Sequence, residues 1–198
     1  MKLDHLAIAA ETLEEGVSWA EERMGVTFQG GGKHERFGTH NKLLGLEDDI
    51  YIEVIAADPS ANSMGPRWFG LDVFSGPPRL VNWICEPCVL EPLLIHGMEA
   101  VEMSRDELRW DMGVPPDGTL PMGGGFPTVL SWKTDTPPGA KLISSGLKLE
   151  VLTVRHPNAL DIAAELDGVL RDDRVRFAED ATISLSAQFC SENGLITL

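Results

Sequence analysis

Two Arg-Trp pairs are the residues of this sequence whose types suit the binding of a small anion. Arg67 precedes Trp68, and Arg109 precedes Trp110 on a predicted strand. A guanidinium can donate two parallel hydrogen bonds to a carboxylate or phosphate, and an adjacent indole ring offers a flat wall. We therefore predict that these four residues bind substrate. The alternative is that each Arg faces outward and pairs with one of the 31 acidic residues, with each Trp in the core.

Two ionisable residues lie within apolar runs that predict strands. His5 stands in Leu3-Asp4-His5-Leu6-Ala7-Ile8, and Glu53 in Tyr51-Ile52-Glu53-Val54-Ile55. An isolated charge is costly in such surroundings, so each side chain needs a polar partner, which could be the other residue or water. His40, on the strand next to Glu53, could act as a general base or as a hydrogen-bonding group for substrate. It could equally cap backbone groups near a turn.

The other motifs point less clearly to chemistry. Cys85-Glu86-Pro87-Cys88 follows an apolar strand and precedes a predicted helix, a context similar to a thioredoxin active site. The surrounding elements do not give a thioredoxin sheet, and no second CxxC completes a zinc site, so two small buried residues are the alternative. The glycine runs at 30–32 and 123–125 lack the spacing of phosphate loops and predict turns. We expect His34 and His96 in exposed loops and His156 at a structural corner.

The elements that must position these residues repeat along the chain. Period-two alternation predicts a strand over Leu3–Ala9, and a capping box at Thr12 and Glu15 opens a helix that ends at Gly25. Strands over 26–29, 39–46 and 49–57 complete a β-α-β-β-β unit. Similar orders recur, with helices over 89–97 and 159–170. We predict one domain over 1–198 with units of about 1–57, 79–134 and 146–198; which two units share a cavity stays open.

Several segments resemble a known family. The runs around His5 and Glu53 resemble the first and fourth strands of vicinal oxygen chelate proteins. More narrowly, the chain resembles glyoxalase-like domain proteins over nearly its whole length, in Gly38-Thr39-His40-Asn41, Pro66-Arg67-Trp68-Phe69-Gly70-Leu71-Asp72, Leu108-Arg109-Trp110 and Val154-Arg155-His156-Pro157. The resemblance implies an α+β fold in which βαβββ units form a curved, mostly antiparallel sheet, a half-barrel cup, with flanking helices.

The resemblance also implies a candidate metal site. Metal-dependent members take a His from the first strand and a Glu from the fourth, so His5 and Glu53 are candidate ligands of Zn, Ni, Mn or Fe. His40 is a candidate third ligand, and His40 and Glu53 are candidate catalytic residues. The second unit departs from the pattern, because Asn82-Trp83-Ile84 and Leu130-Ser131-Trp132 contain neither His nor Glu. A site without metal is therefore equally plausible.

Three functions follow from these residues. The first is a metal-assisted lyase, isomerase or dioxygenase-like enzyme acting on a small oxygenated molecule. The second is a metal-free module of the same superfamily that binds or sequesters a small molecule. The third, a thiol redox protein, depends on Cys85 and Cys88 alone.

The composition and charge of the chain limit the classes of partner that we expect it to bind. Sixteen Lys and Arg against 31 Asp and Glu give a net charge of −15, which disfavours nucleic acid and anionic membranes. No apolar run approaches the roughly 18 residues of a membrane span. No secretory signal is visible at Met1-Lys2-Leu3, so we expect a cytoplasmic protein. We expect a small-molecule ligand as partner, and a homodimer is possible.

Overall fold

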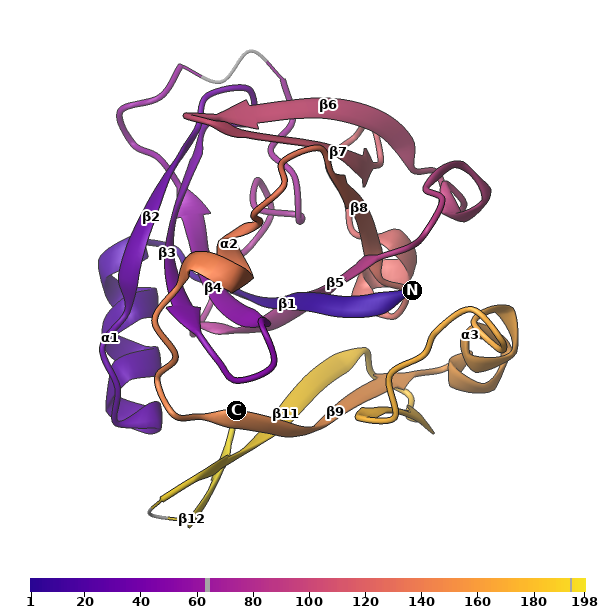
Figure 1. Ribbon diagram of the computed structural model, residues 1–198. Helices are drawn as coiled ribbons and strands as arrows, with labels where there is room; N and C mark the ends of the chain where they lie inside the picture. Colours follow the sequence, from indigo (N-terminus) through magenta and orange to yellow (C-terminus); the bar gives the residue numbers. More distant parts are fainter. Residues whose placement is uncertain (63–64, 193) are drawn as a thin grey trace.

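One curled sheet of eight strands forms the larger part of the structure. The computed structural model describes residues 1–62, 65–192 and 194–198. The strand order is β2-β3-β4-β1-β5-β8-β7-β6, which puts β1 and β5 at the centre and β2 and β6 at the edges (Figure 1). Among the described residues, no helix has the length and apolar character to cross a membrane.

The sheet consists of two halves with the same topology. The first half contains β1 (Lys2–Ala9), α1 (Leu13–Met24), β2 (Gln29–His34), β3 (Thr39–Gly45) and β4 (Tyr51–Ala57). The second contains β5 (Arg79–Glu86), η1 (Glu91–Leu93), β6 (Glu99–Arg105), β7 (Leu108–Val114), η2 (Pro121–Gly124) and β8 (Thr128–Trp132). In each half the first strand runs parallel to the fourth, and the halves join through the antiparallel pair β1–β5. This arrangement confirms the predicted α+β fold with its curved sheet.

The first helix is built as the sequence predicts. The Thr12 side chain accepts a hydrogen bond from the backbone N–H of Glu15, and Gly25 ends the helix in the left-handed region at φ 67°. Gly16 lets the helix approach β4, because a Cβ at this position would lie 2.6 Å from a methyl carbon of Val54. The helix thus covers the outer face of the first half.

The C-terminal part forms a second, smaller sheet. It contains β9 (Lys148–His156), α3 (Ala159–Glu165), β10 (Val175–Glu179), β11 (Ser184–Ser191) and β12 (Gly194–Thr197), in the order β10-β9-β11-β12. The element order is again β-α-β-β-β. The pairing differs from the two halves, because β9 is parallel to its second strand, β10, and antiparallel to β11. Figure 1 shows this sheet packed below β1 and β5.

Two apolar clusters lie on opposite faces of the large sheet. One lies between the two sheets and contains Trp83 of β5 and Phe189 of β11. The other lies inside the curl and contains Ile84, Trp110 and Leu130. The alternation of Trp83 and Ile84 shows that β5 serves both clusters. The small sheet therefore braces the outside of the cup, and its inside remains available for a site.

The local structure differs from the prediction in several places. The strand predicted over 26–29 lies instead at β2, which includes Gly30–Gly32 in place of the predicted turn. Residues 89–97 contain only the three-residue helix η1, with Pro92 in its first turn. A short helix that was not predicted, α2 (Pro138–Lys141), follows β8 at one end of the curled sheet.

Candidate functional site

A small cavity lies inside the curl, between the two halves. Its volume is about 30 Å³, which is roughly enough for two water molecules. Both halves and the segment carrying α2 contribute its lining: His5, His34, Asn41, Leu43, Tyr51, Glu53, Trp68, Phe69, Arg105, Trp110, Met112, Leu130, Trp132 and Pro138. The polar side chains come mostly from the first half, and the second half supplies an apolar wall.

His5 and Glu53 form the centre of the polar side. In the parallel β1–β4 register, His5 is opposite Tyr51 and Ala7 is opposite Glu53, so the two side chains share a face. His5 Nε2 lies 3.7 Å from Glu53 Oε2. Asn41 Nδ2 donates to Glu53 Oε1 at 2.5 Å, and the Tyr51 ring stacks on His5 with centroids 4.4 Å apart.

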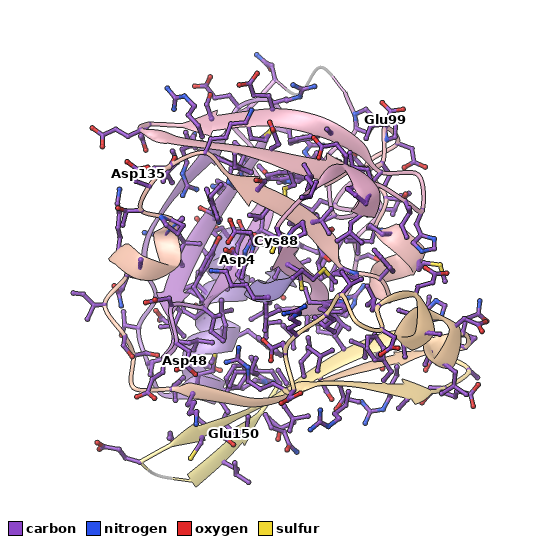
Figure 2. The ribbon with its side chains drawn as sticks, turned by 45° about the vertical axis from the view of Figure 1, so that its right-hand side comes forward. Asp4, Asp48, Cys88, Glu99, Asp135 and Glu150 are labelled. Carbon is purple, nitrogen blue, oxygen red and sulfur yellow. The ribbon has the colours of Figure 1, made fainter. Side chains whose placement is uncertain are left out.

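Asp4 joins this group because β1 is irregular at its position. The β1–β5 register shifts between Leu3 and His5, and such a shift re-aims the side chain at the bulge. Asp4 Oδ1 accepts from His5 Nδ1 at 2.6 Å, and Asp4 Oδ2 accepts from the indole N–H of Trp132 at 2.9 Å. Asp4 therefore connects His5 to the second half, and Figure 2 shows it in the interior of the molecule.

A second group of polar side chains lies where β2, β3 and β6 meet. His34 Nδ1 lies 3.0 Å from Thr39 Oγ1. Arg105 Nη1 donates to Asn41 Oδ1 at 3.2 Å and lies 3.3 Å from His34 Nε2. Asn41 thus contacts both groups, since its amide nitrogen binds Glu53 and its oxygen accepts from Arg105.

The protonation states of the cavity follow from burial and from these partners. Burial alone would lower the pKa of His5, but hydrogen bonds and charges of Asp4 and Glu53 outweigh it and raise this pKa to about 9. Burial would raise the pKa of Glu53, but His5 and Asn41 outweigh it and lower this pKa to about 2. Burial, with the nearby Arg105 cation, lowers the pKa of His34 to about 4. Near neutral pH, His5 is an imidazolium and His34 a neutral imidazole.

Four of the predicted site residues line the cavity. They are His5, Glu53, Trp68 and Trp110. Trp68 is buried and donates from its indole nitrogen to Thr39 Oγ1 at 3.0 Å. Trp110 packs against Trp132, with ring centroids 5.3 Å apart.

The other three predicted site residues are not part of this lining. His40 is half-buried and follows Thr39 and precedes Asn41, so strand alternation turns it to the opposite face of β3. Arg67 pairs with Asp72 at 2.7 Å. Arg109 is exposed and donates to the backbone carbonyls of residues 106 and 108. Arg67 therefore has the acidic partner of the alternative interpretation, whereas Arg109 contacts backbone carbonyls.

The remaining cysteines and histidines occupy other places. Cys85 is fully buried on β5, whereas Cys88 is exposed and is followed by η1 alone. His34 is buried, which makes the predicted exposed loop position wrong. His96 is partly exposed and contacts Glu165 at 2.7 Å. His156 is buried at the end of β9, where its Nδ1 accepts from the backbone N–H of Asn158.

Sequence reasoning missed several lining residues, among them Asn41, Tyr51, Arg105 and Trp132. Asn41 carried a usable signal, because a strand that places Leu43 opposite Glu53 also presents Asn41 on the same face. The sequence around Arg105 carried no such signal, since this residue reaches the cavity only because the edge strand β6 comes close to β2.

The donor atoms available for a metal ion are few. In the second half, the positions that would carry the further His and Glu have Ile84, Leu130 and Trp132 on the cavity side. Among the described residues, no group of three or more His, Cys, Asp and Glu has the geometry to hold a metal ion. His5 and Glu53 alone supply two ligands, fewer than the three or four of a typical protein zinc site. The residues therefore do not fit a metal centre of the four-ligand type.

Similar proteins are found among solved structures and among family models. A hypothetical protein from Staphylococcus aureus superposes with a TM-score of 0.61 at 16% identity, covering 92% of this chain and 87% of that one. The methylmalonyl-CoA epimerase from Mycobacterium tuberculosis has a TM-score of 0.44 at 19% identity, covering 66% of this chain and 85% of that one. A Streptomyces coelicolor methylmalonyl-CoA epimerase variant in complex with 2-nitronate-propionyl-CoA has a TM-score of 0.45 at 13% identity. This match covers 68% of this chain and 97% of that one. A search of curated protein sequences finds no match.

Two halves of like topology around one cavity, together with a family match, place the chain in the vicinal oxygen chelate superfamily. Within it, the chain belongs to the glyoxalase-like domain family, whose sequence model matches residues 3–170. The match includes the large sheet except for Lys2, together with β9 and α3, and it ends before β10.

Proposed function

We propose that this protein binds a small organic molecule, without a metal ion, in the cavity, which widens to admit a ligand larger than the roughly two waters that fit its volume as it stands. The observation that carries the proposal is the wall opposite His5 and Glu53. That wall consists of Trp110, Met112, Leu130 and Trp132, at or near the positions where metal-dependent members place their further ligands. Apolar and aromatic walls with a few convergent polar groups are the usual lining of a small-molecule site.

The ionisation of the polar side also favours binding over proton transfer. A general acid or base works best when its pKa lies near the operating pH. The pKa of Glu53 is lowered to about 2, and that of His5 is raised to about 9. Both groups therefore keep their charges near neutral pH and present a fixed pattern of charge to a ligand.

A binding experiment with a blocked cavity tests this proposal. Untagged, chelator-treated protein is titrated with benzyl alcohol, benzamide and benzoate while tryptophan fluorescence is followed, because three tryptophans line the cavity. We expect saturable quenching for at least one compound, unchanged by added Zn, Ni, Mn or Fe. Leu130→Phe fills the cavity and should abolish the quenching. Leu195→Phe, at a side chain 71% exposed on β12, is the matched control.

A metal-assisted enzyme is the second candidate. The 3.7 Å separation of His5 Nε2 and Glu53 Oε2 favours it, because both atoms could bind one ion beside the cavity. Elemental analysis of the untagged protein, beside His5→Ala and Glu53→Gln, tests this candidate. Near-stoichiometric metal in the wild type, lost in both variants, would establish the metal site and overturn the metal-free proposal.

A further inference from the structure

Arg105 is the cation of the cavity lining that comes from the edge of the second half. It is the last residue of β6, directly before the turn to β7, where it pairs with Leu108. Its side chain is half-buried and reaches across to β2 and β3. The lining residues thus include one guanidinium, contributed by neither of the two Arg-Trp pairs.

The partners of Arg105 are neutral. Its side-chain hydrogen bonds go to the Asn41 amide oxygen and to the neutral imidazole of His34. No carboxylate of the described residues lies within ion-pairing distance of it, although the chain has 31 Asp and Glu. By contrast, Arg67 pairs with Asp72 and Arg174 with Asp172. In a protein of charge −15, a cavity guanidinium without an acidic partner indicates a place for an anion from outside.

The acids elsewhere in the cavity are already paired. His5 stands between Asp4 and Glu53, at 2.6 Å and 3.7 Å. Asn41 separates Arg105 from this group, because its amide nitrogen binds Glu53 and its oxygen faces Arg105. The acids on the Glu53 side of Asn41 therefore do not pair with Arg105, and its positive charge can bind an anion from outside.

The backbone of β2 leaves room for the Arg105 side chain. Gly32 lies beneath it, and a Cβ at this position would come within 2.7 Å of Arg105 Cδ. β2 and β6 are the two edges of the sheet and share no strand pairing in the described residues. The guanidinium can thus rotate away from Asn41 and His34 without breaking a backbone ladder, which enlarges the cavity for a ligand.

We propose that the ligand of this cavity carries a carboxylate and that Arg105 binds it. The inference rests on the proposed metal-free binding function and names its ligand class. Two parallel hydrogen bonds from the guanidinium fit a carboxylate. The rest of the ligand would pack against the indole rings of Trp110 and Trp132, which argues for a flat or apolar body. In the bound state the carboxylate replaces Asn41 and His34 as the partner of Arg105.

The test compares benzoate with benzamide, which has nearly the same shape but no charge. Dissociation constants are measured by tryptophan fluorescence for the wild type and for Arg105→Gln, Arg105→Lys and Lys42→Gln. Lys42→Gln is the matched control, because Lys42 is an exposed cation next to Asn41 on the outer face of β3. We expect the wild type to prefer benzoate by roughly tenfold to a hundredfold. Arg105→Gln should abolish the preference, Arg105→Lys should retain part of it, and Lys42→Gln should retain all of it.

The other outcomes separate this inference from the proposed function. Equal binding of benzoate and benzamide, or a preference that survives Arg105→Gln, would overturn the carboxylate ligand and leave a binding cavity. Binding of benzyl alcohol without binding of benzoate would do the same. Failure of all three compounds to bind would overturn both proposals.

Discussion

His5 and Glu53 face each other across the centre of the cavity, with Nε2 and Oε2 3.7 Å apart and about a twentieth of each side chain exposed. The other ring nitrogen of His5 binds Asp4, which in turn accepts from Trp132 of the second half. The pair is therefore not an isolated contact. It belongs to a chain of polar contacts that runs from β4 through β1 to β8 and joins the two halves of the sheet.

Removal of the Glu53 charge should destabilise the protein strongly. Glu53→Gln leaves His5 buried with one of its two acidic partners lost, and breaking a buried ion pair in this way costs about 3 kcal/mol. Urea denaturation near neutral pH measures the change. Glu86→Gln is the control, because Glu86 pairs at 3.4 Å with a Lys2 side chain that is 71% exposed. It should cost less than about 1 kcal/mol. Equal losses in the two variants would contradict the role of the buried pair.

The stability of the protein should be greatest near pH 6.5, since two histidines shift in opposite directions from that value. The folded protein raises the pKa of His5 to about 9, so this contribution is complete below pH 6.5 and is lost as the pH rises towards 9. The folded protein lowers the pKa of His34 to about 4, so stability falls as the pH decreases from 6.5 towards 4. Melting temperatures measured from pH 4 to pH 9 should fall on both sides of pH 6.5, which gives the profile an acidic limb and an alkaline limb.

Single variants assign the two limbs of that pH profile. His5→Gln should flatten the alkaline limb, and His34→Gln should flatten the acidic limb between pH 6.5 and 4.5. Glu53 titrates below that window, because its pKa moves from 4.5 to about 2. An alkaline limb that persists in His5→Gln would show that another group is responsible.

The sequence predicts the fold of this protein better than its site. Alternation and capping signals at Thr12 and Gly25 are local, and they give β1 and α1 correctly. The position of His5 and Glu53 on one face follows from strand periodicity and from the family resemblance. The pairing of β9 with β10 depends on packing against the large sheet, which the order of elements alone does not determine.

The arginines show where local sequence reasoning fails. An Arg beside a Trp looks like an anion site, but adjacent residues of a strand point to opposite faces. Trp110 therefore lines the cavity, and Arg109 points outward to backbone carbonyls. Arg105 reaches the cavity because the sheet curls until β6 meets β2, a long-range event that no window of sequence contains.

The three thiols should differ sharply in reactivity. Cys85 is fully buried and burial raises its pKa, whereas Cys88 and Cys190 are exposed. A thiol reagent added to the native protein should label Cys88 and Cys190 rapidly, and Cys85 only after denaturation. Rapid labelling of all three, or protection of Cys88 by a disulfide with Cys85, would favour the thiol redox function instead.

Gly32 offers a way to displace Arg105 without removing its charge. In Gly32→Ala the new methyl would lie 2.7 Å from Arg105 Cδ, so the side chain must leave its position over Gly32, where it lines the cavity. We expect the preference for benzoate over benzamide to fall severalfold. The free energy of unfolding should change by less than about 1 kcal/mol, because Arg105 is a flexible side chain at a sheet edge.

Gly30→Ala is the matched control, since nothing lies within 4 Å of a Cβ at that position on the same strand. If Gly32→Ala leaves the preference intact, the position of Arg105 over Gly32 is not required for carboxylate recognition. If Gly30→Ala lowers the preference equally, the effect comes from β2 as a whole and not from Arg105.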